Sequence, residues 1–138
     1  MPIEWQKNLE TSIPALDSQH KGIFEAISEF SQKCSEGSPI DEVVKIVEML
    51  ENYTKEHFTY EENLQRYNNY PGLGEQQEQH KVFLEVVAEL KNALVTDGPS
   101  KELAIATKGK LIRWLVQHVR NIDGKFATYM KARIMGQP

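Results

Sequence analysis

Apolar residues recur at every third or fourth position through four long stretches of the chain, and this repeat constrains the fold more than any other feature. Proline and glycine interrupt the repeat at residues 36–39, 68–74 and 96–99. A spacing of three to four residues places the apolar side chains on one face of an α-helix. The sequence therefore predicts four helices, each with a single apolar face, joined by short connections.

The predicted helices should pack against one another through these faces. We expect the helices at about 17–35, 39–66, 73–95 and 100–134, after an irregular arm over residues 1–15. Ser38, which precedes Pro39, and Ser100 are typical of residues that cap a helix N-terminus. Helices with short connections and one apolar face each form an up-down-up-down antiparallel bundle. The sequence thus predicts an all-α four-helix bundle that forms one domain over residues 1–138.

Composition excludes several classes of protein. The chain has 138 residues, a formal net charge of −4 and a single cysteine, Cys34. This charge, without a basic stripe, argues against nonspecific binding of nucleic acid. No apolar run is long enough to cross a bilayer, and the first residues lack the apolar core of a secretory signal. A lone cysteine favours a reducing compartment. We expect a cytoplasmic monomer without nucleic-acid or membrane partners.

The apolar face of each predicted helix carries one histidine. These are the four histidines of the chain: His20, His57, His80 and His118. Two lie near helix starts and two near helix ends, so all four reach the same end of an antiparallel bundle. Glu61 follows His57 by one helical turn and shares its face. One histidine on an apolar face is usually an ordinary core residue, but four on four helices at one level are hard to attribute to chance.

This cluster requires a positive charge, because a buried carboxylate without a partner is costly. No lysine or arginine lies on these faces at that level. Imidazole with carboxylate suits iron, zinc, copper or manganese. Asp123 is a second candidate carboxylate, but five residues after His118 it would point about 140° away on a regular helix. A widened turn or kink is needed, and the adjacent Gly124 would permit one.

These residues lie in segments that resemble the hemerythrins, particularly the standalone bacterial ones. The matching segments are DSQHKGIF (17–24), HFTYEE (57–62), YPG (70–72), HKVF (80–83) and WLVQHVRNID (114–123). The resemblance implies two iron ions in an oxo- or hydroxo-bridged di-iron centre that binds dioxygen reversibly as a hydroperoxide. It implies one iron on His20 and His57, with the open position for oxygen, a second iron on His80 and His118, and bridges from Glu61 and Asp123.

The resemblance also implies an apolar oxygen pocket. Its residues would be Phe58, Trp114, Leu115 and Val119. An apolar pocket keeps water and protons from a bound hydroperoxide, and no acid or base is placed there for turnover. The pattern therefore favours a dioxygen-binding protein, used for storage, delivery or sensing, over an enzyme.

Gln76 departs from the family's pattern, in which this helix carries two histidines one turn apart. Gln76 lies one turn before His80 and should face the same way. Its side-chain oxygen could bind iron weakly, or its amide could hydrogen-bond a water at that position. Glu75 and Glu78 lack the spacing to replace it.

Gln76 also motivates an alternative function. This is a di-iron redox enzyme or sensor, oxidase- or peroxidase-like or reactive toward nitric oxide, that uses an exchangeable position created by Gln76. A third interpretation, an interaction module without functional metal, conflicts with the six retained candidate ligands.

Overall fold

The protein is built from helices that run along a common axis. The computed structural model describes Thr11 and residues 13–135. Along the chain its elements are α1 (Pro14–Ser35), α2 (Ile40–Tyr67), α3 (Leu73–Asp97), α4 (Lys101–Gln117), the π-helical segment η2 (His118–Asp123) and α5 (Gly124–Met135). No strand occurs in this part of the chain. Residues 1–10 and 12, most of the predicted irregular arm, lie outside the described residues, and α1 begins at Pro14, earlier than expected.

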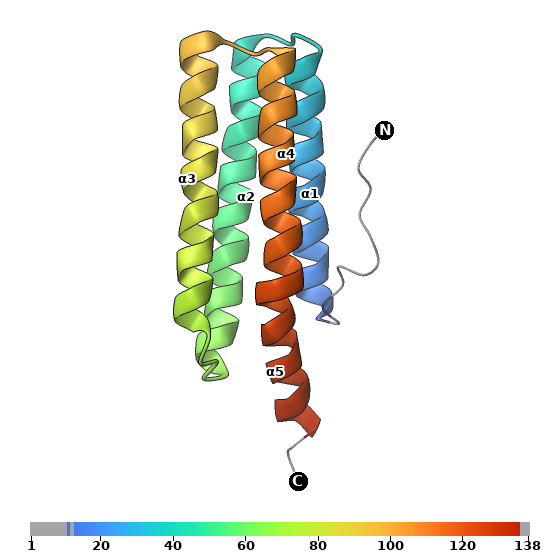
Figure 1. The fold of residues 1–138 in the computed structure, drawn as a ribbon, viewed down its shortest axis with the longest axis vertical. Helices are drawn as coiled ribbons and strands as arrows, with labels where there is room; N and C mark the ends of the chain where they lie inside the picture. The colour runs from blue at the N-terminus through green and yellow to red at the C-terminus, as the bar shows by residue number, and fades with distance from the viewer. Residues whose placement is uncertain (1–10, 12, 136–138) are drawn as a thin grey trace.

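The helices form an antiparallel bundle, as predicted. In Figure 1, α1 to α4 lie side by side, and α5 continues the line of α4 beyond the end of the bundle. Helix α1 packs against α2 and α4, and α3 packs mainly against α2. The all-α four-helix bundle is therefore confirmed, with α4, η2 and α5 together serving as its fourth helix. Within the described residues, no helix combines the length and the apolar character needed to span a membrane.

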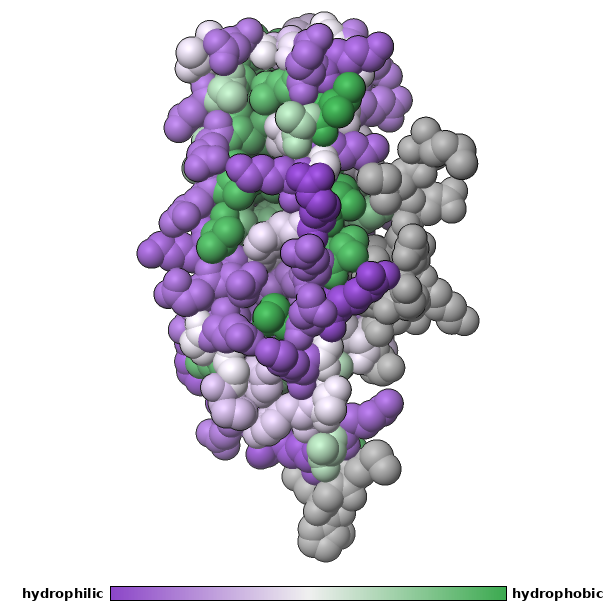
Figure 2. Space-filling model, in the orientation of Figure 1, coloured by the Kyte–Doolittle hydropathy of each residue, from purple (hydrophilic) through white to green (hydrophobic). Residues whose placement is uncertain are grey.

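The predicted apolar faces form the core. Fully buried side chains from every bundle helix meet there, among them Ile27, Phe30, Val47, Leu50, Phe83, Val87 and Leu111. Hydrophilic side chains cover most of the face seen in Figure 2, and hydrophobic ones form separate patches. The inward face shifts near the end of α2. Helical spacing from His57 and Glu61 favours an inward Leu64, but Leu64 is only half-buried and the next residue, Gln65, is completely buried.

Two glycines terminate helices by adopting a left-handed backbone conformation. Gly37, after α1, has φ of 74°, and Gly98, after α3, has φ of 77°. Glycine adopts this conformation without the steric cost that a Cβ atom imposes. The Gly98 N–H donates to the Leu94 carbonyl at 2.9 Å, which satisfies one of the last carbonyls of α3. The two glycines thus end α1 and α3 abruptly, which is consistent with the short connections predicted between the helices.

The two predicted serine caps have different outcomes. Ser100 Oγ accepts a hydrogen bond from the Leu103 N–H at 3.0 Å, so Ser100 caps α4 as predicted. The prediction for Ser38 is wrong, because Pro39 is the N-cap of α2 and no side chain caps that end. The Ser38 N–H instead donates to the Lys33 carbonyl at 3.1 Å. Ser38 therefore completes the end of α1 and lies one residue before the N-cap position of α2.

This difference predicts unequal effects of two otherwise identical substitutions. Ser100→Ala should lower the free energy of unfolding by about 1 kcal/mol, because the cap of α4 is lost. Ser38→Ala should change it by less than about 0.5 kcal/mol. Urea titration of the metal-free variants, followed by circular dichroism, measures both values. Equal losses in the two variants would contradict the assignment of the cap.

Candidate metal centre

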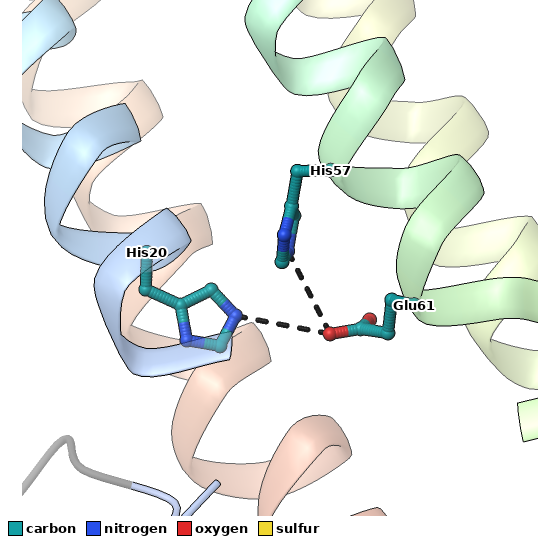
Figure 3. Close-up of side chains that lie close together, drawn as sticks. All are labelled: His20, His57 and Glu61. Carbon is teal, nitrogen blue, oxygen red and sulfur yellow. Dashed lines mark ion pairs between the residues drawn. The ribbon is translucent and has the colours of Figure 1, made fainter. Parts of the chain in front are cut away.

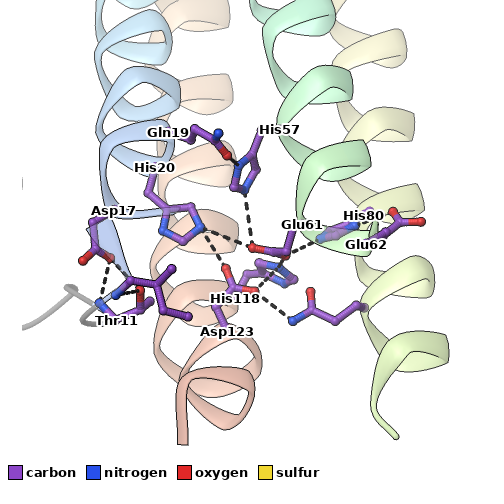
Figure 4. A network of polar contacts seen from close by, with 12 residues as sticks. Thr11, Asp17, Gln19, His20, His57, Glu61, Glu62, His80, His118 and Asp123 are labelled. Carbon is purple, nitrogen blue, oxygen red and sulfur yellow. Dashed lines mark hydrogen bonds and ion pairs between the residues drawn. The ribbon is translucent and has the colours of Figure 1, made fainter. Parts of the chain in front are cut away.

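Four histidines converge inside one end of the bundle, as the sequence predicted. Each comes from a different part of the bundle: His20 from α1, His57 from α2, His80 from α3 and His118 from the start of η2. Their exposed fractions are between 1% and 3%. Figure 4 shows the side chains in one polar network. Helix direction accounts for this meeting, because the starts of α1 and α3 lie beside the ends of α2 and α4.

Glu61 lies between the histidines and is completely buried. Its Oε2 is 3.6 Å from His57 Nε2 and 3.8 Å from His20 Nε2, as drawn in Figure 3. Its Oε1 is 3.0 Å from His80 Nε2 and 3.8 Å from His118 Nε2. Each carboxylate oxygen thus faces its own pair of imidazoles. This is the geometry of a carboxylate that can bridge two neighbouring cations.

Asp123 reaches the same centre because the helix widens. Residues His118–Asp123 form a π-helix, in which residues five apart lie about one turn apart. Asp123 is completely buried, with Oδ1 3.2 Å from His118 Nε2 and Oδ2 2.9 Å from His20 Nε2. The predicted widened turn is therefore confirmed.

The suggested role of Gly124 in the widened turn is not supported. Gly124 has an ordinary helical φ of −59°. A Cβ atom there would meet only the Val119 carbonyl oxygen, at an ordinary contact distance of 3.7 Å. The widened turn therefore needs neither the conformational freedom nor the small size of glycine.

The donor set fits a pair of transition-metal ions. One group that could hold a cation is His20, His57 and Glu61, and a second is Glu61, His80 and His118, with the ligand atoms of each group within 4.8 Å of one another. Asp123 adds one oxygen to each group. Imidazole and carboxylate together suit iron, and inward-facing histidine and carboxylate side chains build di-metal sites in helical bundles. Among the described residues, no lysine or arginine pairs with either carboxylate, and both carboxylates face only imidazoles and the Gln76 amide.

In the absence of metal, protons supply the positive charge. Burial opposes protonation of His20, but hydrogen bonds and negative charge from Asp123 and Glu61 raise its pKa to about 9. The same balance of burial against these carboxylates raises the pKa of His118 to about 9. Burial lowers the pKa of His57 to about 4. Burial opposes ionisation of Glu61 too, but its histidine partners hold its pKa well below the usual range. Two protonated imidazoles can thus balance two carboxylates.

Two residues that the sequence analysis missed orient the imidazoles from outside. Gln19 Oε1 lies 2.6 Å from His57 Nδ1, and Glu62 Oε2 lies 2.8 Å from His80 Nδ1. An Nδ1–H that donates outward leaves Nε2 free to bind a metal, and such partners fix the orientation of metal-bound histidines. Glu62 lies off the apolar face of α2, where periodicity predicts a solvated side chain, but it is only 22% exposed and contacts His80. Its place directly after Glu61 was the only available signal.

Gln76 faces the centre, as its position one turn before His80 predicted. Its side chain is completely buried. The amide Nε2 donates to Asp123 Oδ1 at 2.9 Å, whereas Oε1 has no hydrogen-bond partner. In this arrangement the amide holds a carboxylate of the centre.

The four residues expected to line an oxygen pocket all lie near the histidines or in the core. Phe58 stacks on His80 with ring centroids 3.8 Å apart, and Trp114 stacks on His118 at 4.4 Å. Phe58 also lies 5.6 Å from the His57 ring. Leu115 and Val119 are buried in the hydrophobic core. Aromatic and aliphatic groups therefore cover the centre on its core side.

Comparison with known proteins agrees with this geometry. The model of the hemerythrin HHE cation binding domain matches residues 11–130. A bacteriohemerythrin of Stenotrophomonas maltophilia (strain R551-3) is 30% identical over 136 residues, which cover 94% of this chain and 82% of that protein. A bacteriohemerythrin of Pseudomonas aeruginosa (strain UCBPP-PA14) is 31% identical over 122 residues, covering 88% and 77%. A myohemerythrin of Riftia pachyptila is 28% identical over 125 residues, covering 91% of each chain.

The shifted pKa values predict how pH affects the metal-free protein. The pKa of His20 and of His118 rises from 6.5 to about 9 on folding, so their stabilisation is complete below pH 6.5 and is lost as pH rises through about 9. The pKa of His57 falls to about 4 on folding. Below pH 6.5 the unfolded chain therefore binds a proton that the folded chain does not, and the free energy of unfolding decreases as pH falls toward 4. The free energy of unfolding should therefore be greatest near pH 6.5. Chemical denaturation between pH 5 and pH 9.5 checks this, and a flat profile above pH 6.5 would contradict it.

The Glu62–His80 contact predicts a role for Glu62 in metal affinity. Glu62→Ala should weaken metal retention about 10- to 100-fold, because His80 loses the partner that orients and polarises it. Glu56→Ala removes the same charge from an exposed position on α2 and should leave affinity unchanged. Competition with a chelator measures both. Identical retention in the two variants would show that Glu62 does not support the centre.

Proposed function

This chain belongs to the hemerythrin family, and from that membership we propose that it binds dioxygen reversibly at its di-iron centre. The family is one of oxygen-binding proteins with a di-iron centre, not of enzymes. The observation that carries the proposal is the convergence of four buried imidazoles on two buried carboxylates whose oxygens face opposite imidazole pairs. The arrangement offers donors for two adjacent metal ions, and one ion would leave half of them unused.

The proposed ligands divide into two halves. In the first half, His20 and His57 would hold one iron. In the second half, His80 and His118 would hold the other. Glu61 and Asp123 would be shared by the two, an assignment supported by the way each carboxylate divides its oxygens between the imidazole pairs. Asp123 Oδ2 lies near His20 and Oδ1 near His118.

The chemistry of oxygen binding is supplied by the metal pair and protected by the chain. A ferrous pair held here would supply the two electrons that dioxygen takes up on binding and would take them back when dioxygen is released. Phe58, Leu115 and Val119 are almost fully buried, and with Trp114 they are the proposed oxygen pocket. Apolar walls keep out the water and protons that would make the electron transfer irreversible. The outward hydrogen bonds of His57 and His80 hold the imidazoles in place.

One observation favours the alternative function, a redox enzyme or sensor open to peroxide or nitric oxide. Gln76 occupies a buried position in the second half, where an amide is a weaker metal donor than an imidazole. An exchangeable position there could hasten irreversible oxidation. Membership of a family of oxygen-binding proteins favours reversible binding as the principal function.

A visible spectrum of the iron-loaded, reduced protein tests the proposal. We expect a charge-transfer band that appears when oxygen is added and disappears when it is removed. Glu61→Ala should prevent loading of two irons per chain, because a bridging carboxylate is lost. Glu56→Ala on the same helix provides the control. Direct, irreversible passage to an oxidised spectrum in the unsubstituted protein would favour the redox enzyme or sensor.

A further inference from the structure

Two buried glutamines, Gln65 of α2 and Gln76 of α3, occupy matching positions one turn beyond the metal centre. Helices α2 and α3 are antiparallel, and their contacts define a register: Phe58 lies against Phe83 with ring centroids 5.9 Å apart. One turn further along, Glu61 Oε1 lies 3.0 Å from His80 Nε2. One more turn toward the α2–α3 connection, the same register brings Gln65 opposite Gln76. Both side chains are completely buried.

The amide groups of this pair are largely without protein partners. Gln76 Nε2 donates to Asp123 Oδ1, but Gln76 Oε1 has no hydrogen-bond partner. Gln65 Nε2 and Oε1 have none either. Buried amides are normally satisfied, because leaving one unpaired costs the hydrogen bonds it made with water. One donor and two acceptors are therefore held inside the bundle next to the second half of the centre.

The position of Gln76 relates these amides to the metal. It lies one turn from His80 and bonds the Asp123 oxygen that faces His118. Gln76 therefore occupies the position from which a side chain of α3, in addition to His80, could donate to the second iron. An amide that holds Asp123 through Nε2 turns its oxygen elsewhere, and a small ligand can then reach the metal in its place. Gln65, which the register places opposite Gln76 on α2, can bond the end of such a ligand that points away from the metal.

We propose that Gln65 and Gln76 form a second ligand site on the di-iron centre, for small hydrogen-bonding ligands of the iron held by His80 and His118. The class is water or hydroxide at rest and small anions that accept a hydrogen bond from an amide N–H. The site is polar and differs from the apolar pocket proposed for dioxygen. The inference rests on the proposed function, because it requires a metal pair in this centre.

Titration of the oxidised, iron-loaded protein with azide tests the inference. We expect two azides per di-iron centre, detected by absorption spectroscopy and calorimetry. Gln76→His should reduce the number to one, because an imidazole fills the second position. Gln65→Met keeps the length of the side chain but removes the amide. It should lower the affinity for the second azide about tenfold, because one hydrogen bond to the ligand is lost. Gln77→Leu, at an exposed neighbouring position of α3, should leave both azides bound.

A second measurement needs no metal. In the metal-free protein, Gln65→Met should leave the urea midpoint unchanged or raise it, because the lost amide had no protein partner. A lowered midpoint would mean that Gln65 bonds within the protein, for example directly to Gln76, and would overturn the inference.

The outcomes separate the two claims. A protein that loads two irons and oxygenates reversibly but takes one azide would overturn the second site and leave the proposed function intact. A protein that fails to load two irons would overturn both. Two azides that persist unweakened in Gln65→Met and Gln76→His would place the second azide elsewhere and overturn the assignment to these amides.

Discussion

The burial of Glu61 and Asp123 among four imidazoles is the interaction on which the rest of the structure depends. Two carboxylates with no exposed surface require nearby positive charge, and no lysine or arginine among the described residues supplies it. Protons on His20 and His118 can do so, and a metal pair can replace them. Both sources of charge require that the four histidines, from two helix starts and two helix ends, lie at the same end of the bundle. The antiparallel bundle meets this condition through its connections, which keep neighbouring helices in register.

The π-helical segment shows how this requirement overrides the ordinary preference of the backbone. Regular α-helix through Asp123 would turn its carboxylate away from His118 by about 140°. The widened turn brings both to the centre, with Oδ1 3.2 Å from Nε2. Isolated π-helical turns are rare and occur often at functional sites. Since a Cβ atom at position 124 would fit, no glycine is needed, and the buried contacts of His118 and Asp123 are the evident stabilisation of this turn.

The inward faces of the helices could be predicted from sequence, whereas the surroundings of the centre could not. Helical periodicity placed His20, His57, His80 and His118 inside, because one helical turn relates neighbours on a face. Gln19 and Glu62 bond imidazoles from the flanks of their helices, where periodicity predicts solvent. Gln65 was missed because the inward face of α2 shifts by one residue near its end. The Ser38 cap was predicted wrongly because α2 begins at Ile40 with Pro39 as its N-cap, one residue later than expected, and sequence does not fix a helix boundary to one residue.

The two halves of the centre contain equal numbers of imidazoles but have unequal surroundings. In the first half, His57 bonds the neutral amide of Gln19. In the second, His80 bonds the Glu62 carboxylate, which makes an imidazole a stronger donor to a metal. The second half also contains Gln76, an amide where an imidazole would donate more strongly. Glu62 would therefore strengthen electron donation to the second metal through His80, whereas Gln76 would weaken it. In the centre that we propose, His80 would donate more strongly to the metal while Gln76 would leave one ligand position exchangeable, so that the two halves would differ in the ligands they accept.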